Sequence, residues 1–246
     1  MSGPIVVDVG NSRIKWGLCS SDLVWSIAAL PPDEPNAWQK QWHDWKLQRS
    51  QEWIVAGVHP PRRAALVAWL LERCDGVQIL KSHKQLPIQV EVEHPEKVGI
   101  DRLLNAVAAN RRRQENVAAI LVDAGSAVTV DYVDGMGIFR GGSIFPGFRL
   151  MARALHDYTA LLPIVELDEE VSVPGTTTVH AIQAGIFHAV LGGIERLIAE
   201  YQHRYPTAFE IFLTGGDAKP LASRLRHHAH LWPEMTLDGI LHCRPR

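Results

Sequence analysis

The sequence predicts an α/β protein made of two similar domains, each with a mixed sheet and flanking helices. Apolar runs at residues 4–9 and 118–122 each lead into an acidic loop that contains glycine. Each loop is followed by two further strand-like segments, and then by helical and strand-like segments in alternation. A chain of 246 residues can form one large domain or two modest ones, and the repeated pattern favours two.

The first half begins with a predicted β-hairpin. Strand-like residues 4–9 and 13–19 flank the turn Gly10-Asn11-Ser12, and a third strand at 23–28 extends the meander. The segments that follow are predicted as a tryptophan-rich helix after Pro35, a strand at 52–58, a helix at 64–74, a strand at 77–80 and a helix from 101 to about 113.

The tryptophan-rich helix carries Trp38, Trp42 and Trp45, spaced four and three residues apart. This spacing places the three indoles on one helix face. An apolar helix face usually packs against its own sheet, which is the favoured interpretation. A partner-binding stripe is the alternative.

The second half repeats the pattern of the first, with a junction predicted near residues 113–117. Its predicted elements are strands at 118–122, 126–133 and 137–144, a helix opened by Pro146-Gly147, a long helix at 179–201, a strand at 209–213 and a helix from Thr214-Gly215-Gly216 to residue 226. The succession of three antiparallel strands and then alternating helices and strands indicates a duplicated domain.

The composition is that of an ordinary globular protein, with 46% hydrophobic and 21% charged residues. A net charge of −2 offers no electrostatic reason to expect a nucleic-acid or anionic-membrane partner. No uninterrupted apolar stretch approaches the ~20 residues of a membrane helix, and no signal peptide is expected. The scattered residues Cys19, Cys74 and Cys243 form no CxxC pair or disulfide framework, so the prediction is a cytoplasmic protein.

The two acidic loops share an Asp at the end of an apolar run, a glycine and a hydroxyl residue. They contain Asp8, Gly10, Asn11 and Ser12, with Lys15 close behind, and Asp123, Gly125 and Ser126. Backbone N–H groups and hydroxyls can donate hydrogen bonds to phosphate oxygens, and carboxylates can hold a cation between them. The pair of loops therefore predicts a nucleotide-phosphate site, although the sequence contains no GxxxxGK(S/T) loop.

Six motifs occur in a fixed order and are specific only as a set. They are DxGN(S/T)xxK at Asp8–Lys15, GxDR at Gly99-Ile100-Asp101-Arg102, DxG(S/T)A at Asp123–Ala127, GGxIxPG at Gly141–Gly147, TxxAIxxG at Thr178–Gly185, and Thr214-Gly215-Gly216. In these motifs the chain resembles the type III pantothenate kinases of the acetate/sugar kinase, Hsp70 and actin superfamily.

The resemblance implies two ribonuclease H-like, actin-like domains, at residues 1–115 and 116–246. It implies ATP-dependent phosphorylation of the primary hydroxyl of pantothenate to 4'-phosphopantothenate, the first step of coenzyme A biosynthesis. It also implies Mg²⁺, a monovalent cation (K⁺ or NH₄⁺) and a cytoplasmic homodimer.

The resemblance further assigns roles to individual residues. Asp101 would be the catalytic base, with a helix N-cap beside Arg102 as the structural alternative. Asp8 would hold Mg²⁺ and Asp123 K⁺, although the sequence alone cannot separate K⁺ from a second Mg²⁺. The phosphate and nucleotide contacts would be Gly10, Asn11, Ser12, Lys15, Gly125, Ser126, Gly215 and Gly216. The substrate contacts would be Gly99, Ile100, Arg102 for the carboxylate, and Thr178 from a second protomer.

The chain departs from the family pattern at several positions. Ser12 and Ser126 replace threonines and keep the hydroxyl, whereas Val92 stands near the place of a substrate-contacting tyrosine. This leaves open a related kinase that acts on another small hydroxylated substrate. A non-catalytic nucleotide-binding regulatory protein is the alternative of a different class.

Overall fold

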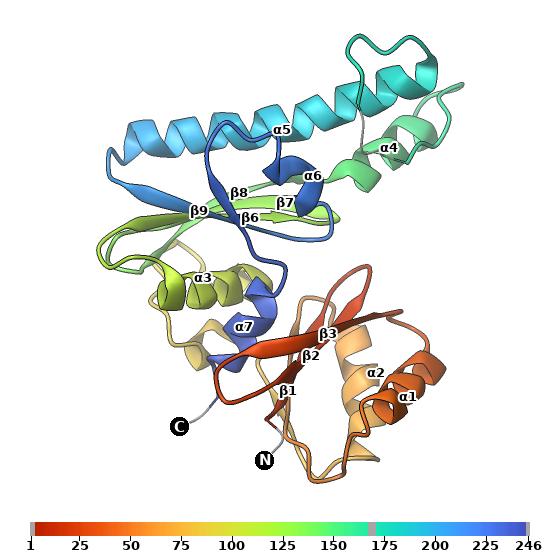
Figure 1. The fold of residues 1–246 in the computed structure, drawn as a ribbon, viewed down its shortest axis with the longest axis vertical. Coiled ribbons are helices and arrows are strands. Elements are labelled where there is room, and N and C mark those ends of the chain that lie inside the picture. Colours follow the sequence, from red (N-terminus) through yellow and green to blue (C-terminus); the bar gives the residue numbers. More distant parts are fainter. Residues whose placement is uncertain (1–2, 167–170, 245–246) are drawn as a thin grey trace. The chain divides into compact units, whose positions relative to one another are not determined.

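The computed structural model describes residues 3–166 and 171–244 (Figure 1). The chain divides into two compact units. Unit 1 comprises Met1–Arg112, Gly137–Phe139 and Glu234–Arg246, and unit 2 comprises Arg113–Met136 and Arg140–Pro233. The chain first leaves unit 1 at Arg113, close to the predicted junction. Its C-terminal segment then returns to unit 1, which the predicted domains 1–115 and 116–246 did not include.

Unit 1 contains one mixed five-stranded sheet in the order β3-β2-β1-β4-β5. Strand β1 is antiparallel to β2 and parallel to β4. The strands are β1 (Ile5–Val9), β2 (Ile14–Cys19), β3 (Val24–Leu30), β4 (Trp53–Gly57) and β5 (Val77–Ile79). The helices are α1 (Pro35–Asp44), α2 (Pro60–Leu71), α3 (Ile100–Arg112) and α7 (Met235–Leu241), with short 3₁₀ turns at His83–Gln85 and Pro95–Lys97.

Unit 2 repeats this arrangement. Its sheet has the order β8-β7-β6-β9-β10, with β6 antiparallel to β7 and parallel to β9. The strands are β6 (Ala118–Ala124), β7 (Ala127–Val133), β8 (Phe139–Pro146), β9 (Phe209–Thr214) and β10 (Ala229–Leu231); the helices are α4 (Phe148–Asp157), α5 (Thr178–Arg204) and α6 (Ala218–Ala222). The same strand order in both units confirms the predicted duplicated α/β fold.

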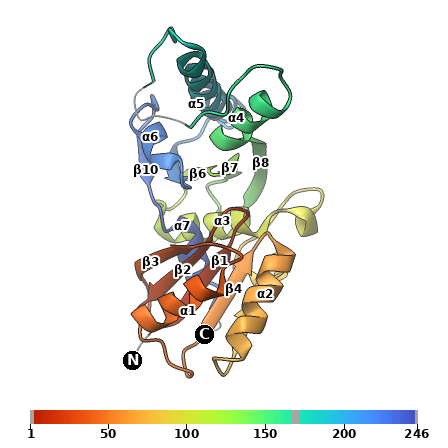
Figure 2. The ribbon, with the colours of Figure 1, turned by 90° about the vertical axis from the view of Figure 1, so that its right-hand side faces the viewer.

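One face of the unit 1 sheet is covered by α1 and α2 (Figure 2). Trp38 is buried here, and its indole N–H donates to the carbonyl of Pro31 at 2.9 Å. Trp42 stacks on the fully buried Trp53, with ring centroids 5.7 Å apart. The indoles predicted on one helix face therefore pack against the sheet of their own unit.

The opposite face of the same sheet is covered by α7, which also packs against α3. Glycines allow this close packing. A Cβ on Gly17 of β2 would lie 3.2 Å from the Leu237 side chain, and a Cβ on Gly239 would lie 2.1 Å from the Leu104 carbonyl oxygen. The C-terminal helix thus completes the core of unit 1.

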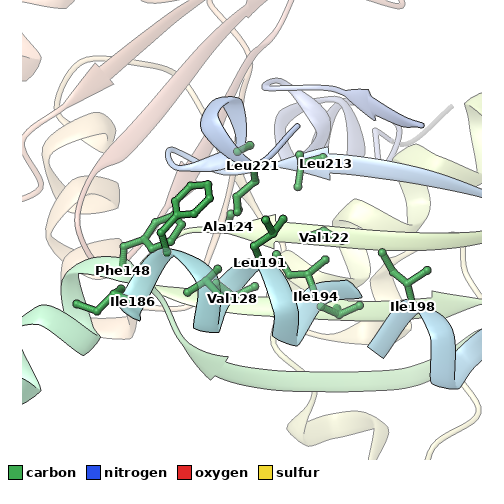
Figure 3. Packing of buried hydrophobic residues seen from close by; sticks show 14 of the residues in the cluster. Val122, Ala124, Val128, Phe148, Ile186, Leu191, Ile194, Ile198, Leu213 and Leu221 are labelled. Atoms are coloured by element: carbon green, nitrogen blue, oxygen red, sulfur yellow. The ribbon is translucent and has the colours of Figure 1, made fainter. Parts of the chain in front are cut away.

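The core of unit 2 lies between its sheet and α5 (Figure 3). Ile186, Ile194 and Ile198 of α5 are buried against strand residues that include Val122 and Val128. By length and composition α5 is the one described helix that could cross a membrane, and half of that window is buried within the protein. The apolar face of α5 is explained by its packing in the core of unit 2.

The elements after β9 differ most from the prediction. Helix α6 ends at Ala222 instead of residue 226, and β10 and α7 were not predicted. Strand β10 is only three residues long and is completed by parallel pairing with β9. Such a short segment has too few residues to carry a periodic signal, so its structure depends on the partner strand.

Candidate active site

The first acidic loop connects the antiparallel strands β1 and β2. Asp8 lies directly opposite Lys15, so the two side chains project from the same face of the sheet. The core residues Val7 and Trp16 project from the other face. The loop closes with a hydrogen bond from the Gly10 N–H to the Arg13 carbonyl at 3.1 Å, and its tip residues are exposed. The Lys15 ammonium group at the base of this turn can attract a phosphate, and the Asp8 carboxylate can hold a cation beside it.

The second predicted set, Gly99 to Arg102, lies at the start of α3. The Arg102 backbone N–H donates to Asp101 Oδ1 at 2.8 Å. Burial raises the pKa of Asp101 above its ordinary value, and the nearby N–H and charge of Arg102 oppose this shift only in part. A raised pKa suits a carboxylate that accepts a proton during a reaction.

The neighbours of Asp101 in this segment lie in different environments. A Cβ on Gly99 would lie 2.6 Å from Asp101 Oδ1, so the glycine leaves room for the carboxylate. The Arg102 guanidinium lies 5.6 Å from the centre of the Phe139 ring. The Ile100 side chain is buried, which leaves its backbone as the part that could meet a substrate.

The second acidic loop lies at the end of β6 in unit 2. Asp123 is the register partner of Thr129 on β7 and of Thr214 on β9. The Gly147 N–H donates to the Ser126 carbonyl at 3.0 Å, and a Cβ on Gly147 would lie 2.1 Å from the Gly125 carbonyl oxygen. The GGxIxPG segment therefore packs directly against this loop.

The Thr214-Gly215-Gly216 loop reaches the same edge of the sheet. Gly215 has φ +101°, and a Cβ there would lie 2.2 Å from the Ala124 carbonyl oxygen. The Asp217 N–H donates to that carbonyl at 2.9 Å. Because β6 and β9 are parallel, their carboxyl ends bring the second acidic loop and the glycine pair together.

Thr178 lies on α5, a different element of unit 2 from these loops. It is exposed at the first position of α5, where the Thr177 hydroxyl accepts a hydrogen bond from the His180 N–H at 3.2 Å. Two turns of helix, about 12 Å, separate Thr178 from Ile186 in the core. The Thr178 side chain is thus presented at the surface of unit 2.

The structure assembles the predicted residues into separate sets. Asp8, Lys15 and the turn between them form one set, and Gly99 to Arg102 form another, both in unit 1. Asp123, Gly125, Ser126 and Gly215 form the set in unit 2. The convergence of Asp8, Asp101 and Asp123 on one triphosphate stays a prediction.

Two residues at these loops were not predicted from the sequence. Thr129 lies opposite Asp123, a position that follows from counting back across the predicted hairpin. Arg62 of α2 donates a hydrogen bond to the Asn11 carbonyl of the first loop. No local pattern marks Arg62, because 51 residues separate it from Asn11.

The comparisons with known proteins agree with the motifs. A family model described as "Type III pantothenate kinase" matches residues 4–200. A protein of that name from Alkalilimnicola ehrlichii is 31% identical over 245 residues, which cover 96% of this chain and 95% of the relative.

Solved structures agree on the fold. A 2-dehydro-3-deoxygalactonokinase protein from Sinorhizobium meliloti aligns with a TM-score of 0.61 at 12% identity, over 97% of this chain and 96% of that one. A Baf family transcriptional activator from Campylobacter jejuni aligns with a TM-score of 0.62 at 22% identity, over 97% and 96%. At these identities the likeness concerns the fold alone.

Proposed function

The chain belongs to the type III pantothenate kinase family, and we infer from this membership that it phosphorylates pantothenate with ATP in coenzyme A biosynthesis. The observation that carries the inference is the family match over residues 4–200. That range contains both acidic loops, the Asp101 set and Thr178.

Asp101 is proposed as the base of the transfer. The primary hydroxyl oxygen of pantothenate attacks the γ-phosphorus of ATP, the bond from that phosphorus to the β,γ-bridging oxygen breaks, and ADP leaves. The hydroxyl proton passes to the Asp101 carboxylate. The raised pKa of Asp101 supports this role, because it brings the carboxylate closer to the operating pH.

Asp8 and Lys15 are proposed to serve the phosphates, with Asp8 as a ligand of Mg²⁺. When bound, the ion neutralises charge on the phosphate oxygens. Across the described residues, no group of three or more His, Cys, Asp or Glu could hold a metal ion. Such a cluster is not required, because Mg²⁺ at phosphates usually takes one or two carboxylates together with water and substrate oxygens.

Asp123 is proposed to hold the monovalent cation. The Thr129 hydroxyl supports this assignment, because its oxygen is buried without a hydrogen-bond partner among the described residues. Thr129 lies directly across from Asp123 on the neighbouring strand. Hydroxyl and carboxylate oxygens are suitable ligands for a hard cation, so the two residues fit K⁺ or NH₄⁺ at this edge.

Arg102 is proposed to recognise the pantothenate carboxylate. The segment around Val92, where the family has a tyrosine, lies near Arg102 in unit 1. The Glu91 N–H donates to the Phe139 carbonyl at 3.0 Å, and Phe139 is the ring beside the Arg102 guanidinium. Val92 therefore belongs to the same neighbourhood as Arg102, where it would supply apolar contact in place of a phenol.

A homodimer is proposed from the surface of unit 2. Large apolar side chains stay exposed on β8, on α4 and in the loop that follows α4. They are Ile144, Leu150, Tyr158 and Leu161. Exposed apolar groups of this size favour an interface, and Thr178 is presented on the same unit. A second protomer would cover these groups and receive Thr178 in its substrate site. We also propose a cytoplasmic location.

A coupled assay of ADP release tests the function directly. We expect ADP release to depend on pantothenate and to be faster in K⁺ than in Na⁺ buffer. Sugars, glycerol and acetate serve as the comparison panel. Turnover with one of these substrates and none with pantothenate would overturn the substrate assignment. Stoichiometric ATP binding with no product would instead indicate a nucleotide sensor.

A further inference from the structure

We propose that Arg62 is a positioning residue that holds the first acidic loop ready for the nucleotide, and that Asp33 in turn holds Arg62. The inference deepens the proposed function and rests on it, because the loop is taken to bind ATP phosphates. It concerns three segments of unit 1 that lie far apart in the sequence.

One guanidinium joins these three segments. Arg62 Nε donates to Asp33 Oδ1 at 3.0 Å and Nη2 donates to Asp33 Oδ2 at 2.6 Å, which makes a two-pronged ion pair. Arg62 Nη1 donates to the Asn11 carbonyl oxygen. The Arg62 backbone N–H is held by His59 Nδ1 at 3.3 Å, at the N-cap of α2. We name this Asp33–Arg62–Asn11 arrangement the loop tether.

The strand order of unit 1 brings the tether together. Strand β1 runs parallel to β4, so the loop after β1 and the start of α2 after β4 reach the same sheet edge. Strand β3 ends at Leu30, opposite Ile14 at the start of β2. Asp33 follows three residues later and therefore lies beside the same loop.

The chemistry of the tether suits positioning more than stability. Surface ion pairs contribute little to folding, and the Asp33 side chain is 64% exposed. A planar guanidinium that donates two hydrogen bonds to one carboxylate has a defined orientation. Its Nη1 therefore meets the Asn11 carbonyl from a fixed direction. The Arg62 hydrogen bond holds the pKa of Asp33 below its ordinary value, so the carboxylate stays ionised further into acid than a free aspartate.

The test compares Arg62→Gln and Asp33→Asn with the control Arg49→Gln. Arg49 forms an ion pair with Asp75 at 2.9 Å that is exposed on both sides, so it matches the chemistry without touching the loop. Six quantities are measured on the full chain: kcat, KM for ATP, KM for pantothenate, affinity for the non-hydrolysable analogue adenylyl imidodiphosphate in the presence of Mg²⁺, amide exchange of residues 10–13, and Tm.

For Arg62→Gln we expect roughly a tenfold loss in kcat/KM for ATP, because a small misplacement of a binding group is costly. We expect faster amide exchange at residues 10–13, with the KM for pantothenate and the Tm unchanged. Asp33→Asn should show the same changes to a smaller extent. Arg62→Lys should restore only part of the activity, because it keeps the charge and loses the fork.

Two results would overturn the tether. Arg62→Gln could behave like the Arg49→Gln control in both ATP affinity and amide exchange. Alternatively, Asp33→Asn could bind the analogue more tightly than the wild type, which would mean that Arg62 contacts phosphate directly and that Asp33 competes for it. If the wild type forms no phosphopantothenate, the function fails by itself, and amide exchange still tests the tether.

Discussion

At the residue scale, the environment of Asp101 explains how one carboxylate can act as a base. Its carboxylate accepts a hydrogen bond from the Arg102 N–H at 2.8 Å, and Gly99 has no side chain that would collide with it. Burial favours the neutral form of the acid and so raises its pKa. The same burial makes the ionised form costly to the fold, so the residue proposed as the base also affects stability.

Asp101→Asn is expected to abolish most of kcat while ATP affinity is retained. The folded pKa of Asp101 lies above the unfolded value, so its favourable contribution to stability is present in acid and is lost as pH rises through the folded pKa. The variant should therefore have a higher Tm than the wild type at pH 7, with a difference that shrinks towards acid pH. Steady-state kinetics and thermal unfolding between pH 4 and about pH 8 check this.

The pH profile of the wild type provides a second check on the same residue. Activity should fall in acid as Asp101 becomes protonated, with a midpoint above the ordinary aspartate pKa. Near wild-type turnover of the Asn variant would rule out Asp101 as the base. A lower Tm of that variant at pH 7 would contradict the burial argument.

At the element scale, the helix glycines show what packing requires. Gly239 of α7 lies against the backbone of α3, where a Cβ would be 2.1 Å from the Leu104 carbonyl oxygen. Gly192 of α5 has no neighbouring atom within 4 Å of a Cβ position. The same residue type thus serves close helix contact in one helix and is only a cost in backbone entropy in the other.

This contrast predicts opposite effects of one substitution. Gly239→Ala should destabilise unit 1, because backbone cannot move aside for a methyl group at that distance. Gly192→Ala should stabilise the protein by about 1 kcal/mol through helix propensity. Urea unfolding measures both. Destabilisation by Gly192→Ala would mean that another chain packs on that helix face.

At the scale of the whole molecule, the fold is a duplicated unit whose C-terminal helix belongs to the first copy. The strand orders β3-β2-β1-β4-β5 and β8-β7-β6-β9-β10 match element by element. Helix α7 follows the last strand of unit 2 as α3 follows the last strand of unit 1, yet both helices pack in unit 1.

Removal of residues 234–246 is expected to unfold unit 1. Met235, Leu237, Ile240 and Leu241 are almost fully buried, and loss of four such side chains removes roughly 6–12 kcal/mol. That is comparable to the whole stability of a typical domain, about 5–15 kcal/mol. Seven of the eight tryptophans lie in unit 1, so intrinsic fluorescence reports its state. A native emission spectrum from the truncated chain would contradict this expectation.

The sequence by itself determined the features that depend on neighbouring residues. The hairpin around Gly10, the face formed by Trp38 and Trp42, and the two acidic loops all follow from spacings of two to four residues. The ordered motifs also identified the family, from which the substrate is inferred. These signals are local, because side-chain periodicity and turn chemistry act over a few residues of backbone.

The tertiary structure alone decided which distant segments meet. The return of α7, the pairing of β10 with β9, and the contact of Arg62 with Asn11 join residues that no local pattern connects. Such contacts depend on strand order and on the burial of apolar faces from several elements at once. Spacing therefore predicted the candidate residues for the chemistry, and the strand order of the sheets decided which distant residues lie beside them.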